Sequence, residues 1–269
     1  MNTSQKLHNA ARSYCIDRDA YWRAEYHALM DRGADRAGSE YTDKAYDMFP
    51  RYNILSAILT DIERLDSDAL PELAEMAELL ILSGHTAQSI FTEKSGSDIR
   101  SAAIADERQR FADVIAKWLS NSIPDISPLP YRRVLSDAEV QALWKRVEAR
   151  WGTRGSYFYP LAESTDPSLI AFDATAFYRH LPPASLQNIL RAQGTSRLFE
   201  LREYGDNNYQ LSVDAWDPYY GVWGEGFWFT DTLDWIMYAS HEDSVTTGGI
   251  LTDAVVAKWP EAKQHPWNI

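Results

Sequence analysis

The feature that most constrains the fold is the segment 124–130, in which three of seven residues are proline. Proline donates no backbone hydrogen bond and favours extended chain, so no helix continues through this segment. Apolar residues follow a helical period before the segment and largely alternate after residue 152. We therefore predict an α+β protein with a helical domain over 1–123, a proline-rich linker over 124–135 and an α+β domain over 136–269.

The first domain carries apolar residues every three or four positions, as amphipathic helices do. The first helix contains Cys15 on this apolar stripe, which indicates a core cysteine rather than a nucleophile. Residues 41–49 form a second segment, after which Pro50 suits the first turn of a further helix. Two more helices are expected, one over 70–82, ended by Gly84, and a long one over 98–119.

The second domain begins with a helix capped by Ser136 and Glu139, whose spacing is that of a capping box. Gly152 ends this helix, and further short helices are expected over 183–193 and 251–259. Strand candidates alternate apolar and polar residues between turn residues; they are 197–204, 209–216, 227–229, 233–240 and 245–247. A small antiparallel sheet with flanking helices is therefore expected.

The composition excludes several classes of function. The net charge is −13, from 39 acidic and 26 basic residues, which argues against nucleic-acid binding because phosphate contact needs a basic surface. No apolar run approaches the length of a membrane span, and the first residues lack the apolar stretch of a signal peptide. With a single cysteine the chain forms no intrachain disulfide. We expect a cytoplasmic protein without a membrane partner.

Common catalytic signatures, such as the glycine-rich nucleotide loops and the zinc-protease helix, do not occur in the sequence. No two of the six histidines have metal-ligand spacing, so neither a metal site nor a cofactor is predicted. His241 is the best catalytic candidate, because it ends a predicted strand and precedes Glu242 and Asp243. Asp234 is a further candidate carboxylate partner for this histidine. Ser240 would point to the opposite face of the strand, so it is not expected to pair with His241 directly.

The segment 199–243 is unusually rich in both acidic and aromatic residues. It contains ten carboxylates, twelve aromatic residues and one base, Arg202. These residues could form a sheet core with a hydrated face, a contact surface for a basic protein, or a cleft for a carbohydrate or cationic ligand. A homodimer interface would use the same residue types. The candidate contact residues are Trp216, Asp217, Tyr219, Tyr220, Trp223, Glu225, Asp231, Asp234, His241 and Glu242.

The C-terminal part of the chain resembles bacterial immunity-like proteins of toxin systems. The resemblance lies in three runs of residues, 225–230, 233–242 and 247–249. The resemblance covers the C-terminal part of the chain and brings no set of catalytic residues with it. It implies a non-catalytic protein that neutralises a basic toxin or another basic protein partner. An acidic surface suits that role, because it attracts and blocks a basic phosphate-binding site. A small hydrolase, with His241 and neighbouring carboxylates in an acidic aromatic cleft, is the alternative.

Overall fold

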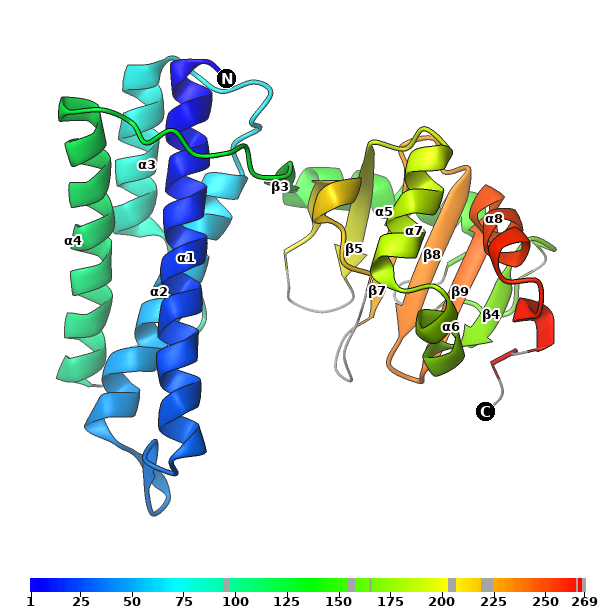
Figure 1. Cartoon of the computed structure of the whole chain (residues 1–269), viewed down its shortest axis with the longest axis horizontal. Coiled ribbons are helices and arrows are strands. Elements are labelled where there is room, and N and C mark those ends of the chain that lie inside the picture. The colour runs from blue at the N-terminus through cyan, green and yellow to red at the C-terminus, as the bar shows by residue number, and fades with distance from the viewer. Residues whose placement is uncertain are drawn as a thin grey trace. The chain divides into compact units, whose positions relative to one another are not determined.

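The computed structural model describes residues 1–93, 97–153, 158–164, 166–202, 207–218, 225–264 and 266–267. The chain forms two compact units, Met1–Leu129 and Pro130–Ile269 (Figure 1). The division between them falls inside the segment that the sequence assigns to a linker. A helical first unit is followed by an antiparallel sheet with flanking helices, which confirms the predicted α+β class.

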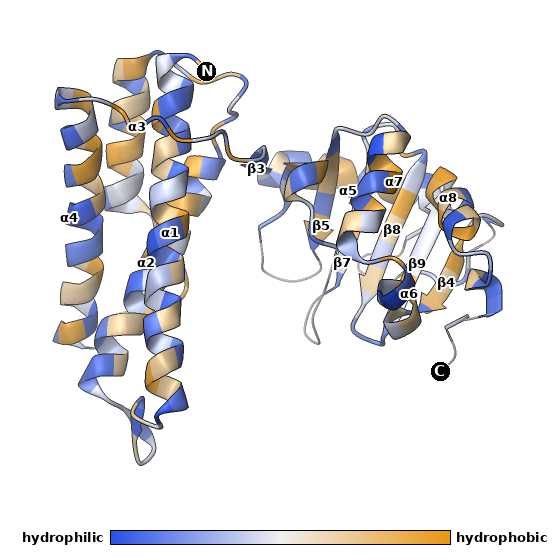
Figure 2. Cartoon of the chain, viewed as in Figure 1, coloured by the Kyte–Doolittle hydropathy of each residue, from blue (hydrophilic) through white to orange (hydrophobic). Residues whose placement is uncertain are grey.

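Long helices packed side by side make up the first unit, with a short hairpin between the first two (Figure 1). Its described elements are α1 (Thr3–Asp31), β1 (Arg36–Ala37), β2 (Glu40–Tyr41), α2 (Asp43–Glu63), α3 (Leu73–Thr86) and α4 (Asp98–Ser120). Figure 2 shows apolar and polar residues alternating around α1 and α4. The apolar stripes meet in one core, which includes Cys15, Ile58 and Phe111.

Two predicted helix boundaries in this unit are wrong. Pro50 lies inside α2, so the predicted segments before and after it form one helix. Buried residues on both sides, such as Ala45 and Ile54, hold the helix together although proline removes one backbone bond. Gly84 lies within α3 and does not end it. A Cβ atom at this position would lie 2.8 Å from the ring of Phe111, so glycine permits close packing of α3 on α4.

A seven-stranded antiparallel sheet, counted over the described residues, forms the centre of the second unit, in the order β3-β6-β5-β7-β8-β9-β4. Its strands are β3 (Arg132–Val134), β4 (Ile170–Asp173), β5 (Arg197–Arg202), β6 (Tyr209–Ser212), β7 (Gly226–Phe229), β8 (Trp235–Ser240) and β9 (Ser244–Gly249). The helices are α5 (Asp137–Trp151), α6 (Ala174–His180), α7 (Pro183–Ala192) and α8 (Ile250–Lys258), with short 3-10 turns η1 (Val213–Ala215) and η2 (Ala262–Gln264).

Both faces of this sheet are covered, and the alternation along each strand decides which side chain faces which layer. On β8, Trp235 and Met237 face the core shared with α6, α7 and α8. Ile236 and Tyr238 face the opposite core, which is shared with α5 (Figure 1). Because both faces are covered, every residue of β8 is buried, and functional side chains can reach solvent only at the strand ends.

Some elements of the second unit are not predicted from the sequence, whereas the structure confirms others that are. Residues 132–134 form the edge strand β3, paired with β6, although they belong to the predicted linker. Neither β4 nor α6 is predicted, because each is short and depends on contacts far along the chain. The capping box of Ser136 and Glu139 is present, and Gly152 ends α5 in the left-handed conformation at φ 72°. Among the described residues, the helices are too short or too polar to cross a membrane.

Candidate functional site

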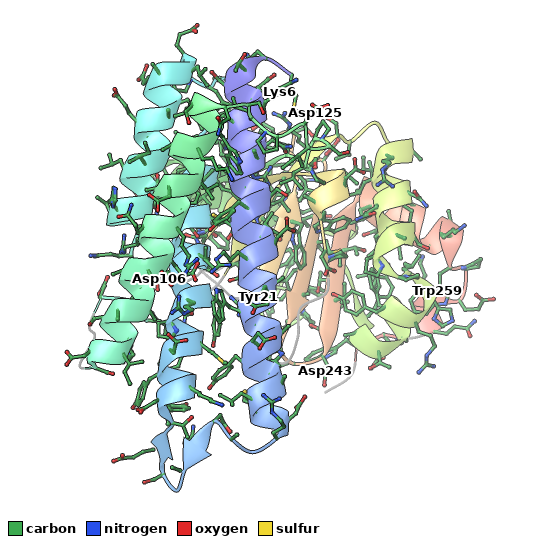
Figure 3. The ribbon with its side chains drawn as sticks, turned by 60° about the vertical axis from the view of Figure 1, so that its left-hand side comes forward. Lys6, Tyr21, Asp106, Asp125, Asp243 and Trp259 are labelled. Atoms are coloured by element: carbon green, nitrogen blue, oxygen red, sulfur yellow. The ribbon has the colours of Figure 1, made fainter. Side chains whose placement is uncertain are left out.

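Chemically reactive side chains meet at the end of the sheet where β7 begins and β8 ends. Gly226 pairs with Ala239, which brings Glu225, just before β7, beside Ser240 at the end of β8. By strand alternation both side chains lie on the α5 side of the sheet, as Phe227 and Tyr238 do. The turn 241–243 then leads into β9. Figure 3 shows Asp243 of this turn at the end of the strands.

The side chains of Glu225, Ser240, His241 and Glu242 contact one another, and we call this group the Glu225 cluster. Nδ1 of His241 lies 2.8 Å from Oε1 of Glu225, and its Nε2 lies 3.2 Å from Oε1 of Glu242. The Ser240 hydroxyl lies 3.1 Å from Oε1 of Glu225 and also contacts Oε2 of Glu242. One serine and one histidine therefore each bridge the same two carboxylates.

The Glu225 cluster is buried on one side and open on the other. Glu225 is 2 % exposed and Ser240 is 8 % exposed, whereas the His241 side chain is 50 % exposed and that of Glu242 is 35 % exposed. The turn is anchored by Trp267, whose Nε1 donates a 2.8 Å hydrogen bond to the Glu242 carbonyl. A ligand from solvent can therefore reach the imidazole and one carboxylate without opening the core.

The Glu225 cluster has fewer hydrogen-bond protons than close contacts between donor and acceptor atoms. A neutral imidazole has one N–H and one lone pair, yet each nitrogen of His241 faces a carboxylate oxygen. The Ser240 hydroxyl has one proton, yet it lies within reach of both carboxylates. A cation bound among these groups would stabilise the close approach of the two carboxylates.

Two other predicted site residues lie at the opposite end of the same strands. Asp231 and Asp234 occupy the connection from β7 to β8, and Asp234 is separated from His241 by about 23 Å along β8. Asp234 therefore cannot assist His241, and that part of the hydrolase hypothesis is wrong. Asp231 pairs with Arg146 of α5 at 2.7 Å. Burial acts to raise the pKa of Asp234, but hydrogen bonds from Thr230 and Thr232 outweigh it and lower that pKa.

The structure describes one of the aromatic residues that were predicted to form a contact surface, and this residue is buried. Trp216 is 1 % exposed and packs against Trp228 and Trp235, with ring centroids 6.1 and 6.5 Å away. It is a core residue and does not belong to a contact surface. Asp217 is exposed. Three further candidates lie outside the described residues; they are Tyr219, Tyr220 and Trp223.

The helical unit also buries charged groups, but they are differently arranged. Arg12 and Glu63 form a buried ion pair at 3.0 Å. Glu107, with 0 % exposure, accepts hydrogen bonds from Arg18 at 2.7 Å and from Arg51 at 3.0 Å. Each of these carboxylates faces at least one guanidinium, which suits a structural role better than a reactive one.

Two more titratable groups of α1 are buried. His8 lies against the Ile62 carbonyl at 3.2 Å, and burial lowers its pKa to about 4. Burial also raises the pKa of the Cys15 thiol well above its usual value. Since the thiolate is the reactive form, this agrees with a cysteine that fills the core.

Comparison with known proteins adds no assignment to this site: no family model matches the sequence, and no curated protein or solved structure is similar to it. The resemblance to immunity-like proteins thus stays a hypothesis.

Proposed function

We propose that the protein binds a basic protein partner through the acidic β8–β9 turn and neutralises it in the cytoplasm, as an immunity-like protein does. The partner would be a toxin domain or another protein with a basic surface. The chain would act by occupying that surface, without catalysis. An acidic surface both speeds the approach of a basic partner and favours it over neutral competitors.

The observation that supports this proposal is the difference between the acids of the β8–β9 turn and three other acids at the surface of the second unit. Asp231, Asp214 and Asp166 each form an ion pair with an arginine, at Arg146, Arg191 and Arg150 respectively. Among the described residues, Glu242 and Asp243 contact no arginine or lysine. The negative charge of the turn therefore remains available to a cationic side chain from another protein.

Two double variants with equal charge test the proposal. Glu242→Gln with Asp243→Asn removes the acids of the turn, and Asp231→Asn with Asp234→Asn removes two acids at the opposite end of the same strands. We expect a basic protein to be captured from the native lysate at low salt and lost at high salt, because salt screens exposed charges. The first double variant should lose that protein and the second should retain it.

The opposite ranking of the two variants, or capture that is indifferent to salt, would contradict the proposed surface. Capture of a second copy of this chain would point to a homodimer instead. Sedimentation of the purified protein distinguishes that outcome from binding to a different protein.

A second candidate function, hydrolysis, is favoured by the convergence of Glu225, Ser240 and Glu242 on His241. In this version Glu225 orients the imidazole and replaces Asp234 as the partner carboxylate. Wild type should then hydrolyse a substrate with a rate that depends on His241, and His241→Gln should lose most of that rate. If both proteins are inactive across ester, phosphoester, glycoside and peptide substrates, the hydrolase candidate fails.

A further inference from the structure

We infer that Glu225, His241 and Glu242 form a binding site for one divalent transition-metal ion, for which Zn²⁺ is the representative probe. This inference goes beyond both candidate functions, because it concerns the isolated protein and needs neither a partner nor a substrate. It also goes against the sequence-based expectation of no metal site, which considered only spacing along the chain.

The three side chains offer a set of donor atoms that suits a metal ion. One ligand atom from each of the three side chains lies within 4.8 Å of the other two. Tetrahedral zinc with bond lengths of 2.0–2.1 Å places its ligand atoms about 3.4 Å apart. Side-chain rotations of about 1 Å would therefore close the site around an ion. An imidazole nitrogen with two carboxylates favours zinc or a related transition metal over Mg²⁺ and Ca²⁺, which prefer oxygen ligands.

The charge of the cluster also suits a cation. Glu225 is 2 % exposed and shares its histidine and its serine with Glu242. Two carboxylates and an imidazole that lie this close, with one carboxylate buried, offer a divalent cation a negatively charged set of ligands. A metal ion bound there would be a strong local positive charge between the two carboxylates. With three protein ligands and a half-exposed imidazole, the fourth position would face solvent and hold water.

Ser244, which is not one of the acidic groups, also points to a ligand at this place. Ser244 is 1 % exposed, and its hydroxyl has no hydrogen-bond partner among the described residues. It pairs with Ser240 across β8 and β9, so both side chains lie on the same face, with their Cβ atoms about 5 Å apart. A buried hydroxyl is rarely left without a partner. A metal ligand or a metal-bound water beside Ser240 would give Ser244 the bond that it lacks.

The test is a metal titration of the full chain after removal of metal with a chelator. Zn²⁺ binding is measured by calorimetry, and Co²⁺ is used for its absorption spectrum, which reports coordination directly. We expect one ion per chain and a cobalt spectrum of a four- or five-coordinate site. Glu225→Gln and Glu242→Gln should each raise the Kd about 100-fold or more, since each removes one charged ligand.

Asp243→Asn is the matched control. It removes one acid from the same turn, and asparagine tolerates the left-handed backbone of this residue, at φ 58°. Its Kd should stay within about threefold of the wild-type value, because a nearby exposed charge contributes little. Circular dichroism confirms that each variant is folded. Glu242 is partly exposed, so Glu242→Gln keeps the test valid if Glu225→Gln does not fold.

Absence of saturable binding would overturn the inference. Equal affinity in wild type and both ligand variants would overturn it as well, because the ion would then be bound elsewhere. Partner capture by metal-free protein is measured separately, so failure of the metal site and failure of the proposed function are distinguishable.

Discussion

The buried carboxylates of this protein face different kinds of group. In the second unit Glu200 pairs with Arg202 at 2.7 Å, as the buried carboxylates of the helical unit pair with arginines, whereas Glu225 faces a histidine. In the helical unit, Glu63 and Glu107 face arginines, which stay charged at every pH at which the protein folds. The buried Glu225 faces His241, whose side chain is half exposed and therefore within reach of a ligand from solvent. The first arrangement makes the charge permanent and structural. The second arrangement leaves the carboxylate accessible to a different positively charged partner, as a binding or catalytic site requires.

The network around Glu107 shows how completely a buried carboxylate can be satisfied. Besides two arginines, it accepts a 3.0 Å hydrogen bond from the indole N–H of Trp22. Arg51 is in turn held by Asp47 and Asp106, at 2.7 and 2.5 Å. Because every member has several partners, removal of one charge disturbs the whole group.

The largest effect is expected for Glu107→Gln. This change leaves Arg18 and Arg51 facing a neutral amide, and breaking a buried ion pair costs about 3–5 kcal/mol. We expect the free energy of unfolding, followed by the helical circular dichroism signal in urea, to fall by that amount. Asp113→Asn removes an exposed acid from the same helix and should change it by about 0.5 kcal/mol or less. Equal losses in the two variants would show that Glu107 is not a structural charge.

A somewhat smaller effect is expected from acidification of the helical unit. Burial lowers the pKa of His8 from 6.5 to about 4, so the unfolded chain binds this proton more readily than the folded one. Stability from this group is complete above pH 6.5 and is lost as the pH falls toward 4. The difference in pKa corresponds to about 3 kcal/mol.

The measurement is the urea midpoint at intervals from pH 7 to pH 4. His8→Gln can still donate to the Ile62 carbonyl but does not titrate, so its midpoint should fall less over the same range. Parallel curves for wild type and variant would mean that His8 is not the group that titrates.

The sequence predicts the helical unit well because its signals are local. Helical apolar periodicity identifies α1 and α4, and the Ser136 capping box identifies the start of α5. The errors arise where a distant contact decides. Gly84 resembles a helix end, but the ring of Phe111 explains the glycine. Short elements such as β3 exist because of their pairing with β6, which no local pattern reveals.

Only part of the candidate site can be predicted from the sequence, because the rest depends on contacts between distant residues. His241 and Glu242 are adjacent at a strand end, so their proximity could be predicted. Glu225 joins them only through the register of β7 on β8, which a strand boundary near Gly226 would have indicated. The same register sends Asp234 to the far end of β8. The acidic residues of this one segment therefore form two separate groups in the folded protein, at opposite ends of the strands.

A third prediction compares Glu225 with Glu107 directly. Glu225→Gln should lower the free energy of unfolding by about 1–2 kcal/mol, less than Glu107→Gln, because the half-exposed His241 regains water as a partner. The change is followed by near-ultraviolet circular dichroism, which reports the tryptophans packed in the second unit. A loss as large as that of Glu107→Gln would mean that the Glu225 cluster is structural, and the contrast between arginine-paired and histidine-paired carboxylates would fail.

The smallest effect is expected where arginine pairing occurs without burial. Glu139 accepts hydrogen bonds from Arg133 and from the Ser136 backbone, and these lower its pKa from 4.5 to about 2. Its contribution to stability is therefore present above pH 4.5 and is lost as the pH falls toward 2. Because the Glu139 side chain is 38 % exposed, solvent screening reduces that contribution to about 0.5–1 kcal/mol.

Glu139→Gln isolates this charge, since glutamine also serves in a capping box. The variant should unfold at lower urea than wild type at pH 7, and the two midpoints should approach each other below pH 4.5 and converge near pH 2. A constant difference across this range would mean that the capping geometry, and not the charge, stabilises α5. A difference of only about 0.5–1 kcal/mol at pH 7 would show that an arginine partner alone does not make a carboxylate structural. Burial must accompany it, as it does at Glu107, and at Glu225 burial is present but the arginine is replaced by a histidine that solvent can reach.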